Sequence, residues 1–407
     1  MDARLRKDAE YIVKKAIEAV MPDAAVKSAL ERAVFSGKVV LVAAGKAAWQ
    51  MANAACDCIG VDRGIVITKY DHGKGPIGNL RIREAGHPTP DENGFAATKE
   101  ALEMVRDLTE SDTVLFLLSG GGSALFELPL IPGGELQDIT RQLLACGADI
   151  TEINTVRKRL SGVKGGKFAL ACQPAQVYSI VLSDVIGDPL DVIASGPACP
   201  DSSTCADALA VAEKYELKLS ERAQKLLWQE TPKRLSNVTT SVNGSVCQLC
   251  AAAAAAAEEL GYEPVLLTCE LTCQARSAGV MLAQKLLDHK EGSVAYIAGG
   301  ETVVTLTGQG KGGRNQELAL SAALPIQALP GAAVFSVGSD GTDGPTDAAG
   351  GYVDHTTASA LEAQGIRVGD ILAENDSYHA LQAVDGLIIT GPTGTNVNDV
   401  AVALLRR

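Results

Sequence analysis

The sequence lacks the features that would place the protein on nucleic acid or in a membrane. Its 407 residues carry a formal net charge of -13, whereas gripping a nucleic-acid backbone or an anionic lipid surface requires clustered lysine and arginine. No run approaches the roughly 18 uninterrupted apolar residues of a membrane-spanning helix. We therefore expect no nucleic-acid partner, no membrane partner and a cytoplasmic location.

We also expect no signal peptide at the start of the chain. Residues 1–20 contain charged residues throughout, and their apolar residues recur at helical spacing, which predicts an amphipathic helix. Hydrophobic residues make up 46% of the chain and charged residues 21%, which is ordinary for a globular protein and excludes a mainly disordered one.

The ten cysteines lack the second close pair that a zinc knuckle requires. Cys247 and Cys250 form one C-x-x-C, which leads straight into a run of alanines at 251–257. A four-thiolate zinc site needs two such pairs. We therefore favour neither a metal-binding nor a disulfide role for the cysteines.

Short apolar runs followed by glycine-rich turns predict the fold class. One series lies at 39–44, 114–118 and 177–182, and a second, after the polar stretch 230–240, lies at 265–268, 294–298, 303–307, 333–337 and 386–390. Alternation with helical patterns predicts an α/β protein with two Rossmann-like domains and mainly parallel sheets. We place the domains at 1–235 and 236–407.

Ligands of such folds bind beyond the carboxyl ends of the strands, and the first unusual motif lies there. It is a glycine loop flanked by two serines: Ser119, Gly120, Gly121, Gly122 and Ser123. Glycines let backbone N–H groups turn onto an anion, and a following helix start adds partial positive charge. We predict phosphate binding, with a tight strand-to-helix turn as the alternative.

Two single residues also follow predicted strands. Lys46 stands alone at the start of an uncharged helical pattern, where it could reach a phosphate or carboxylate or extend into solvent. Asp188 lies between Gly187 and Pro189, which fix its backbone as expected for a carboxylate that accepts a proton or holds magnesium. Asp184 fits a helix cap better.

A basic segment, residues 154–167, contains five cations within eleven residues of this acidic protein. A solvated helix face would explain it. Its glycines, however, interrupt the helix and let the backbone approach an anion, and Asn154 could orient a substrate hydroxyl or carboxylate. We favour an anion pocket.

The second half contains a formal G-x-G-x-x-G at residues 308–313. A nicotinamide site needs an acidic residue about 20 positions later, and residues 328–332 offer none. A guanidinium and an ammonium beside these glycines are instead typical of a phosphate clamp. We predict that the clamp consists of Lys311, Gly312, Gly313, Arg314 and Asn315.

Two aspartates follow the run at 333–337, in S-D-G-T-D-G. The segment lacks the terminal glutamate of an EF-hand, but magnesium needs only one or two carboxylates besides phosphate oxygens and water. We predict Asp340 and Asp343 as magnesium ligands, with a structural turn as the alternative. A last glycine- and hydroxyl-rich turn, 390–399, is expected at a helix start, where Thr393 and Asn396 could contact a nucleotide.

Taken in order, these motifs resemble the class II glycerate kinases, whose C-terminal part is the MOFRL domain and which were formerly named hydroxypyruvate reductases. The resemblance spans nearly the whole chain. It implies two α/β domains with an active-site cleft between them, ATP and Mg²⁺ as cofactors, D-glycerate as acceptor and 2-phosphoglycerate as product. It is carried by S-G-G-G-S-A from Ser119, N-T-V-R-K-R-L-S from Asn154, S-D-V-I-G-D from Ser183, G-G-R-N-Q-E from Gly312 and S-D-G-T-D-G from Ser339.

The resemblance makes Lys46, Asp188 and Arg314 the active-site lysine, aspartate and arginine. On this hypothesis Asp188 takes the proton of the C2 hydroxyl, Lys46 and Arg314 stabilise the moving phosphoryl group, and Asn154 and Arg159 hold the acceptor's carboxylate. Two alternatives stay open: an NAD(P)H-dependent hydroxypyruvate reductase, which would lack its ribose-binding acid, and a non-enzymatic nucleotide sensor. A homodimer is compatible with the sequence, which does not define the oligomeric state.

Overall fold

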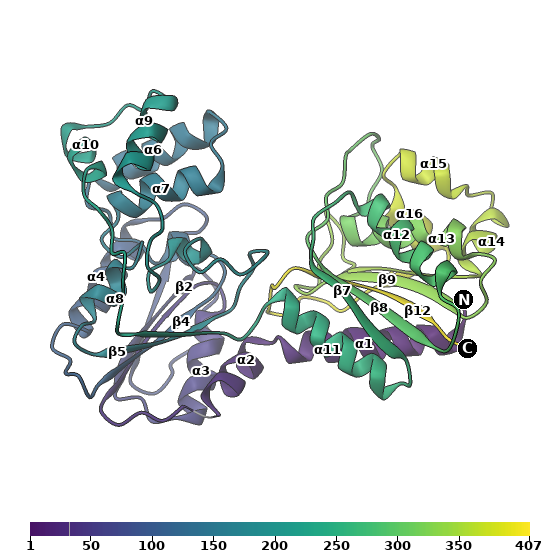
Figure 1. The fold of residues 1–407 in the computed structure, drawn as a ribbon, viewed down its shortest axis with the longest axis horizontal. Helices are drawn as coiled ribbons and strands as arrows, with labels where there is room; N and C mark the ends of the chain where they lie inside the picture. Colours follow the sequence, from purple (N-terminus) through teal and green to yellow (C-terminus); the bar gives the residue numbers. More distant parts are fainter. Residues whose placement is uncertain (32) are drawn as a thin grey trace. The chain divides into compact units, whose positions relative to one another are not determined.

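The computed structural model describes residues 1–31 and 33–407, which form two compact units (Figure 1). One unit comprises residues 25–243, and the other joins residues 1–24 to 244–407. The amphipathic helix predicted at the start of the chain is α1 (Ala3–Ala19) and belongs to the second unit. The domain boundary at residues 235 and 236 stays a prediction. Within the described residues, no helix is long and apolar enough to cross a membrane.

The unit of residues 25–243 is built on the parallel sheet that the sequence predicted. Its six strands run in the order β3-β2-β1-β4-β5-β6, and each neighbouring pair is parallel. Because helices cover both faces, β1 and β4 are buried along their whole length. The strands are β1 (Val39–Ala44), β2 (Arg63–Lys69), β3 (Leu80–Ala85), β4 (Thr113–Leu118), β5 (Gln176–Val181) and β6 (Val238–Val242).

Successive side chains of β1 enter two different cores, since a strand alternates its side chains between its faces. Val40 and Val42 pack with α4 (Glu92–Met104) and α8 (Lys167–Ala171), and Leu41 packs on the other face with α2 and α3. A separate helical core lies beyond the sheet (Figure 1). The remaining helices are α2 (Pro22–Leu30), α3 (Ala48–Cys58), α5 (Gly122–Leu125), α6 (Gly133–Ala145), α7 (Ile150–Leu160), α9 (Cys205–Lys214) and α10 (Glu221–Leu227), with the 3₁₀ turn η1 (Ile193–Ser195).

The sheet of the other unit is mixed, so the prediction of a mainly parallel sheet is wrong here. In the order β11-β10-β9-β12-β8-β7, the pair β7·β8 is parallel and the other neighbouring pairs are antiparallel. The reason is that β12, which follows β11 through the link 389–398, lies between β9 and β8 and runs antiparallel to both. The strands are β7 (Glu263–Leu271), β8 (Val294–Gly300), β9 (Ala332–Gly338), β10 (Gly350–Asp354), β11 (Leu387–Ile388) and β12 (Asp399–Leu405).

Two local predictions in this unit are also wrong. Residues 303–307 were expected to form a strand, but they contribute one bridge, Val303 to Gln274, and Leu306 is 80% exposed. Val304 packs against a core, whereas Val303 and Leu306 are exposed, so this segment forms no buried strand. The turn at 390–399 leads into the buried strand β12 and not into a helix.

Helices cover both faces of the mixed sheet (Figure 1). Helices α1 and α11 share one core with Ile297 and Phe335, while α12 and α13 share the opposite core with Ala298 and Val334. The bounds are α11 (Val246–Glu259), α12 (Ala275–Asp288), α13 (Arg314–Ile326), α14 (Thr357–Glu362), α15 (Val368–Ala373) and α16 (Ser377–Ala383).

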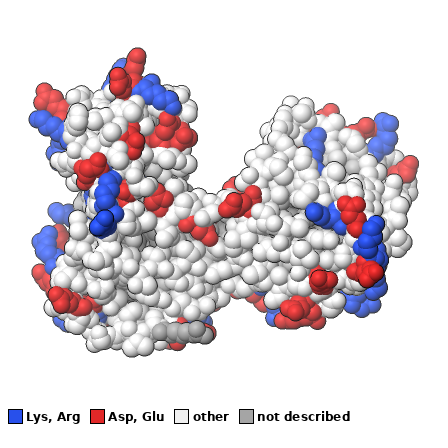
Figure 2. Space-filling model, in the orientation of Figure 1, with Lys and Arg blue, Asp and Glu red and all other residues white. Residues whose placement is uncertain are grey.

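Basic and acidic side chains are interspersed on the face drawn in Figure 2. The chain as a whole has a negative net charge. The described side chains of this face form no continuous basic stripe of the kind that binds an extended polyanion.

Candidate active site

The strand order of the parallel sheet brings Lys46 to the glycine loop. Strands β1 and β4 are neighbours, so the residues that follow Ala44 and Leu118 meet at one edge. The backbone N–H of Lys46 donates to the carbonyl of Gly120 at 2.9 Å, and that of Ala47 donates to the Ser119 hydroxyl at 3.1 Å. These two predicted site segments are thus in direct contact.

The glycines of this loop are required by the close approach of other side chains. Gly121 has a left-handed backbone with φ of 86°, and a Cβ there would lie 3.0 Å from the His87 ring and 3.3 Å from the Lys46 side chain. A Cβ on Gly120 would overlap the Asp184 carboxylate. The loop therefore lies within contact distance of a histidine, a lysine and an aspartate.

His87 is a residue of this edge that the sequence did not point to. Burial and the positive charges of Lys46, Lys69 and His72 lower the pKa of His87. The available signal was the G-H-P turn after β3. Strand β3 itself was not predicted, because its charged residues alternate with apolar ones on a partly exposed edge.

Asp188 follows β5 at the same edge and has a strained backbone. Its φ of 51° is unusual for a residue with a side chain, and Ala194 and Ser195 further along the loop share this conformation. The Oδ1 atom of Asp188 is buried and accepts no hydrogen bond from the described residues. A buried carboxylate oxygen without a donor is costly, and costs of this kind concentrate at functional sites.

Asn154 is linked to the glycine loop through one intermediate side chain. The Ser195 hydroxyl donates to Asn154 Oδ1 at 2.8 Å and lies 3.0 Å from the Ser123 hydroxyl. This connection joins α7, the loop after β5 and the glycine loop. The structure therefore brings Asn154 to the same edge as the other predicted residues of this unit.

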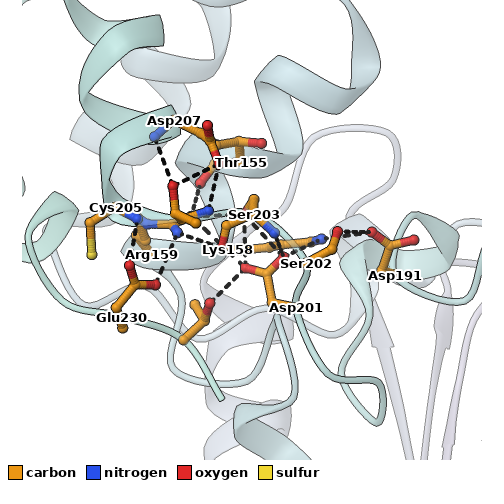
Figure 3. A network of polar contacts seen from close by, with 12 residues as sticks. Thr155, Lys158, Arg159, Asp191, Asp201, Ser202, Ser203, Cys205, Asp207 and Glu230 are labelled. Carbon is orange, nitrogen blue, oxygen red and sulfur yellow. Dashed lines mark hydrogen bonds and ion pairs between the residues drawn. The ribbon is translucent and has the colours of Figure 1, made fainter. Parts of the chain in front are cut away.

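Arg159 instead lies inside a polar network with the loop of residues 191–203 (Figure 3). Arg159 is 1% exposed, and its guanidinium donates to the Thr155 carbonyl at 2.7 Å and to the hydroxyl and carbonyl of Ser203, both at 3.0 Å. Lys158 beside it pairs with Asp201 at 2.9 Å. Contact of Arg159 with a substrate carboxylate stays a prediction.

In the other unit, Arg314 opens α13 between two carboxylates. Its Nε and Nη2 donate to Asp399 at 2.5 and 3.0 Å, and its Nη1 donates to Glu301 at 2.8 Å. Burial lowers the pKa of Arg314, but the hydrogen bonds and charge of Asp399 outweigh it and raise the pKa above its ordinary value. The sequence did not indicate Asp399 as a partner, because β12 was not predicted.

The glycine-rich segment before α13 packs against residues 374–378. The N–H of Gly310 donates to the Glu374 carbonyl at 2.8 Å, and that of Lys311 to Asp376 Oδ1 at 2.9 Å. The Lys311 ammonium lies 4.2 Å from the ring centroid of Tyr378. A Cβ on Gly312 would overlap Ser377, so these glycines face protein atoms, and phosphate binding here stays a prediction.

Asp343 caps the first turn of α13. Its carboxylate accepts the backbone N–H of Asn315 at 3.1 Å and of Gln316 at 2.9 Å, and Asn315 in turn accepts from Ser336. Burial raises the pKa of Asp343 to about 6 although these hydrogen bonds oppose the shift. The structure therefore gives this aspartate a structural role at the helix start, next to Gly313.

Asp340 follows β9 and is half-buried. Its Oδ1 accepts a hydrogen bond from the backbone N–H of Thr342 at 2.9 Å, and its backbone carbonyl accepts one from the N–H of Thr393 at 3.2 Å. Asn396 is exposed in the same turn. In the described ranges, no group of three or more acidic, histidine or cysteine side chains is arranged to hold a metal. A magnesium ion that uses one or two carboxylates and phosphate oxygens fits this arrangement.

The raised pKa of Asp343 gives a pH-dependent contribution to stability. Because the carboxyl binds its proton more tightly in the folded protein, its contribution to the free energy of unfolding should fall by about 3 kcal/mol as the pH rises from about 4 to about 6. We expect the free energy of unfolding of Asp343→Asn to fall less than that of the wild type over this pH range. Urea unfolding of both proteins at pH 4 and 6.5 measures the difference, and identical pH dependence would contradict the assignment.

Comparison with known proteins covers almost the whole chain. A family model described as a domain of unknown function (DUF4147) matches residues 8–228, and that of the MOFRL family matches residues 294–399. The chain is 53% identical to D-glycerate 2-kinase of Thermotoga maritima over 98% of both chains, and 44% identical to glycerate 2-kinase of Pyrococcus horikoshii over 91% of this chain and 88% of that one. A crystal structure of glycerate kinase from Thermotoga maritima superposes with a TM-score of 0.94 over 99% of both chains, at 53% identity.

Proposed function

We propose that this chain, which belongs to the DUF4147/MOFRL family of glycerate 2-kinases, transfers the γ-phosphoryl group of ATP to the C2 hydroxyl of D-glycerate. The bond between the γ-phosphorus and its bridging oxygen breaks, a bond between the C2 oxygen and that phosphorus forms, and the hydroxyl proton leaves to a base. The products are 2-phosphoglycerate and ADP.

The observation that carries this proposal is the buried Asp188 oxygen that accepts no hydrogen bond from the described chain. The attacking hydroxyl must release a proton, and this oxygen, which accepts no hydrogen bond from the described residues, is the proposed acceptor. Asp188 is the base of the proposed reaction. A nucleotide sensor would have no use for such a group.

The glycine loop and Lys46 are the proposed phosphate-binding elements of the first unit. They touch one another, and the basic groups around His87 give this edge the charge that a polyanion needs. Arg314, held by Asp399, supplies the second cation to the transferring phosphoryl group. These residues come from both units, and the cleft that the resemblance implies stays a prediction.

Magnesium is the proposed counter-ion of ATP, with Asp340 as its protein ligand. Asp343 fits this role less well, because both of its oxygens accept backbone N–H groups of α13. When bound, the metal would neutralise charge that develops on the phosphate oxygens. Asn154 and Arg159 are proposed to hold the acceptor's carboxylate, with Asn154 placed at the site edge through Ser195.

Gly121→Ala should weaken ATP binding. An alanine at φ of 86° costs about 1–2 kcal/mol in the left-handed region, and its methyl group would press on His87 and Lys46. We expect the KM for ATP to rise about tenfold with little change in the KM for glycerate. Steady-state kinetics with each substrate varied separately checks this, and Gly134→Ala, where a Cβ meets nothing within 4 Å, is the matched control.

The proposed function is tested by following both candidate reactions with one protein preparation. ADP release that depends on D-glycerate, measured by a coupled assay, is expected. Oxidation of NADH or NADPH by hydroxypyruvate without ADP release would support the reductase alternative. ATP binding without turnover would support the nucleotide sensor.

A further inference from the structure

A buried cluster of three charged side chains, Glu127, Arg157 and Lys164, lies against the end of the glycine loop. The Glu127 and Lys164 side chains are 0% exposed, and that of Arg157 is 12% exposed. Glu127 Oε2 lies 3.4 Å from Lys164 Nζ and 3.6 Å from Arg157 Nη2, yet neither Glu127 oxygen accepts a hydrogen bond from the described residues. Burying three charges costs desolvation that ion pairs repay only in part.

Both cations of the cluster donate to one main-chain atom, the carbonyl oxygen of Ser123. Lys164 Nζ lies 2.8 Å from it and Arg157 Nη2 lies 3.1 Å from it. Lys164 also reaches the carbonyl of Phe126 at 3.4 Å. Because charge-assisted hydrogen bonds are stronger than neutral ones, two such bonds fix the last residue of the glycine loop.

The side chain of Ser123 is also held, because its hydroxyl lies 3.0 Å from the hydroxyl of Ser195. The loop is therefore held at its start by Lys46 and Ala47 and at its end by Lys164, Arg157 and Ser195. The buried cluster also carries one more positive than negative charge. An anion bound at the loop would offset this excess.

We propose that Lys164 is a positioning residue that, together with Arg157, holds the Ser123 carbonyl and so keeps the glycine loop in the conformation that binds the phosphate groups of ATP. This inference rests on the proposed function, because it assigns ATP phosphates to this loop. Lys164 touches no substrate in this account and acts through Ser123.

The test uses a variant that removes the ammonium without leaving a buried carboxylate unpaired. Lys164→Met alone would remove the nearer of the two cations beside the buried Glu127 carboxylate and leave only Arg157, 3.6 Å away. The double variant Lys164→Met/Glu127→Gln also removes the charge of Glu127 and is therefore the informative one. We expect it to fold, as judged by circular dichroism and thermal unfolding, with a KM for ATP at least about tenfold higher and a KM for D-glycerate within about twofold of wild type. A KM for ATP within about twofold of wild type would overturn the proposal.

Lys167→Met is the matched control for a buried lysine. Lys167 Nζ donates to the carbonyls of Lys158 at 2.9 Å, Arg159 at 3.3 Å and Ser161 at 2.6 Å, at the end of α7, and not to the glycine loop. We expect a lower unfolding temperature with an unchanged KM for ATP. An equal rise in this KM for both lysine variants would mean a general structural effect and would overturn the positioning role.

A pH profile of the wild-type enzyme provides a readout that does not depend on any variant. Burial lowers the pKa of Lys164 to about 8, with Arg157 adding to the shift and Glu127 opposing it. Loss of this proton weakens the hold on Ser123, so the KM for ATP should rise above about pH 8. A flat profile from pH 7 to 9.5 would overturn the proposal, whereas wild-type protein without glycerate-dependent ADP release would overturn the proposed function itself.

Discussion

Asp188→Asn should lower turnover by about 10³-fold while the affinity for ATP stays unchanged. Asparagine keeps the shape of aspartate but cannot accept the proton of the C2 hydroxyl, and general base catalysis contributes about 10² to 10⁴-fold. Asparagine also tolerates the positive φ at this position, which is 51°. Loss of activity would therefore reflect the lost base and not a rearranged loop.

The measurement is kcat from initial rates, with ATP affinity from calorimetry. Asp184→Asn is the companion variant, because Asp184 lies in the same loop and beside Gly120. If Asp184→Asn lost the activity and Asp188→Asn kept it, Asp184 would be the base. Unchanged turnover in Asp188→Asn would contradict the proposed role.

Arg314→Ala should also lower turnover by about 10³-fold, because a cation that meets the moving phosphoryl group stabilises charge that develops in the transition state. Arg314→Lys keeps the charge but not the two parallel hydrogen bonds to Asp399, so we expect it to recover only part of the activity. A loss of less than about tenfold in Arg314→Ala would remove Arg314 from the chemical step.

Stability has to be separated from catalysis in this experiment. Removing Arg314 leaves the Asp399 carboxylate buried without its cation, which destabilises the unit by itself. The double variant Arg314→Ala/Asp399→Asn removes this unpaired charge. We expect its unfolding temperature to recover toward that of the wild type while turnover stays low. Recovery of both would assign Arg314 a purely structural role.

The parallel sheet and much of its site edge could be predicted from the sequence because the signals are local. Fully buried strands such as β1 and β4 are continuous apolar runs, and the residues after them, Lys46 and the glycine loop, are placed by the strand order. Edge strand β3 was missed, because half of its side chains are charged and two of these are exposed.

The mixed sheet was beyond prediction for a topological reason. Strand β12 looks like any apolar run, and nothing in its residues reveals that it enters between β8 and β9 in the opposite direction. That placement is what brings Asp399 to Arg314. The glycines at 308–313 allow two explanations, since the contact of Gly308, Gly310 and Gly312 with residues 374–377 demands small residues as strictly as a phosphate would, and phosphate binding there stays a prediction.

The basic segment at 154–167 shows why composition alone does not define a pocket. Its cations are buried or partly buried and contact carbonyls and carboxylates of the same unit, as Lys167 contacts the end of α7 and Lys158 contacts Asp201. Long-range partners of this kind have no signature in the local sequence. The strained φ of Asp188 is likewise visible only once the loop is built.

The central claim, transfer of a phosphoryl group to C2 of D-glycerate, is tested most directly by ³¹P NMR of the purified protein with ATP, Mg²⁺ and D-glycerate. The spectrum separates 2-phosphoglycerate from 3-phosphoglycerate and both from ATP and ADP. We predict a growing 2-phosphoglycerate signal that matches the loss of the γ-phosphate signal. A 3-phosphoglycerate signal would contradict the site of transfer, and no phosphorylated acceptor would contradict the kinase assignment.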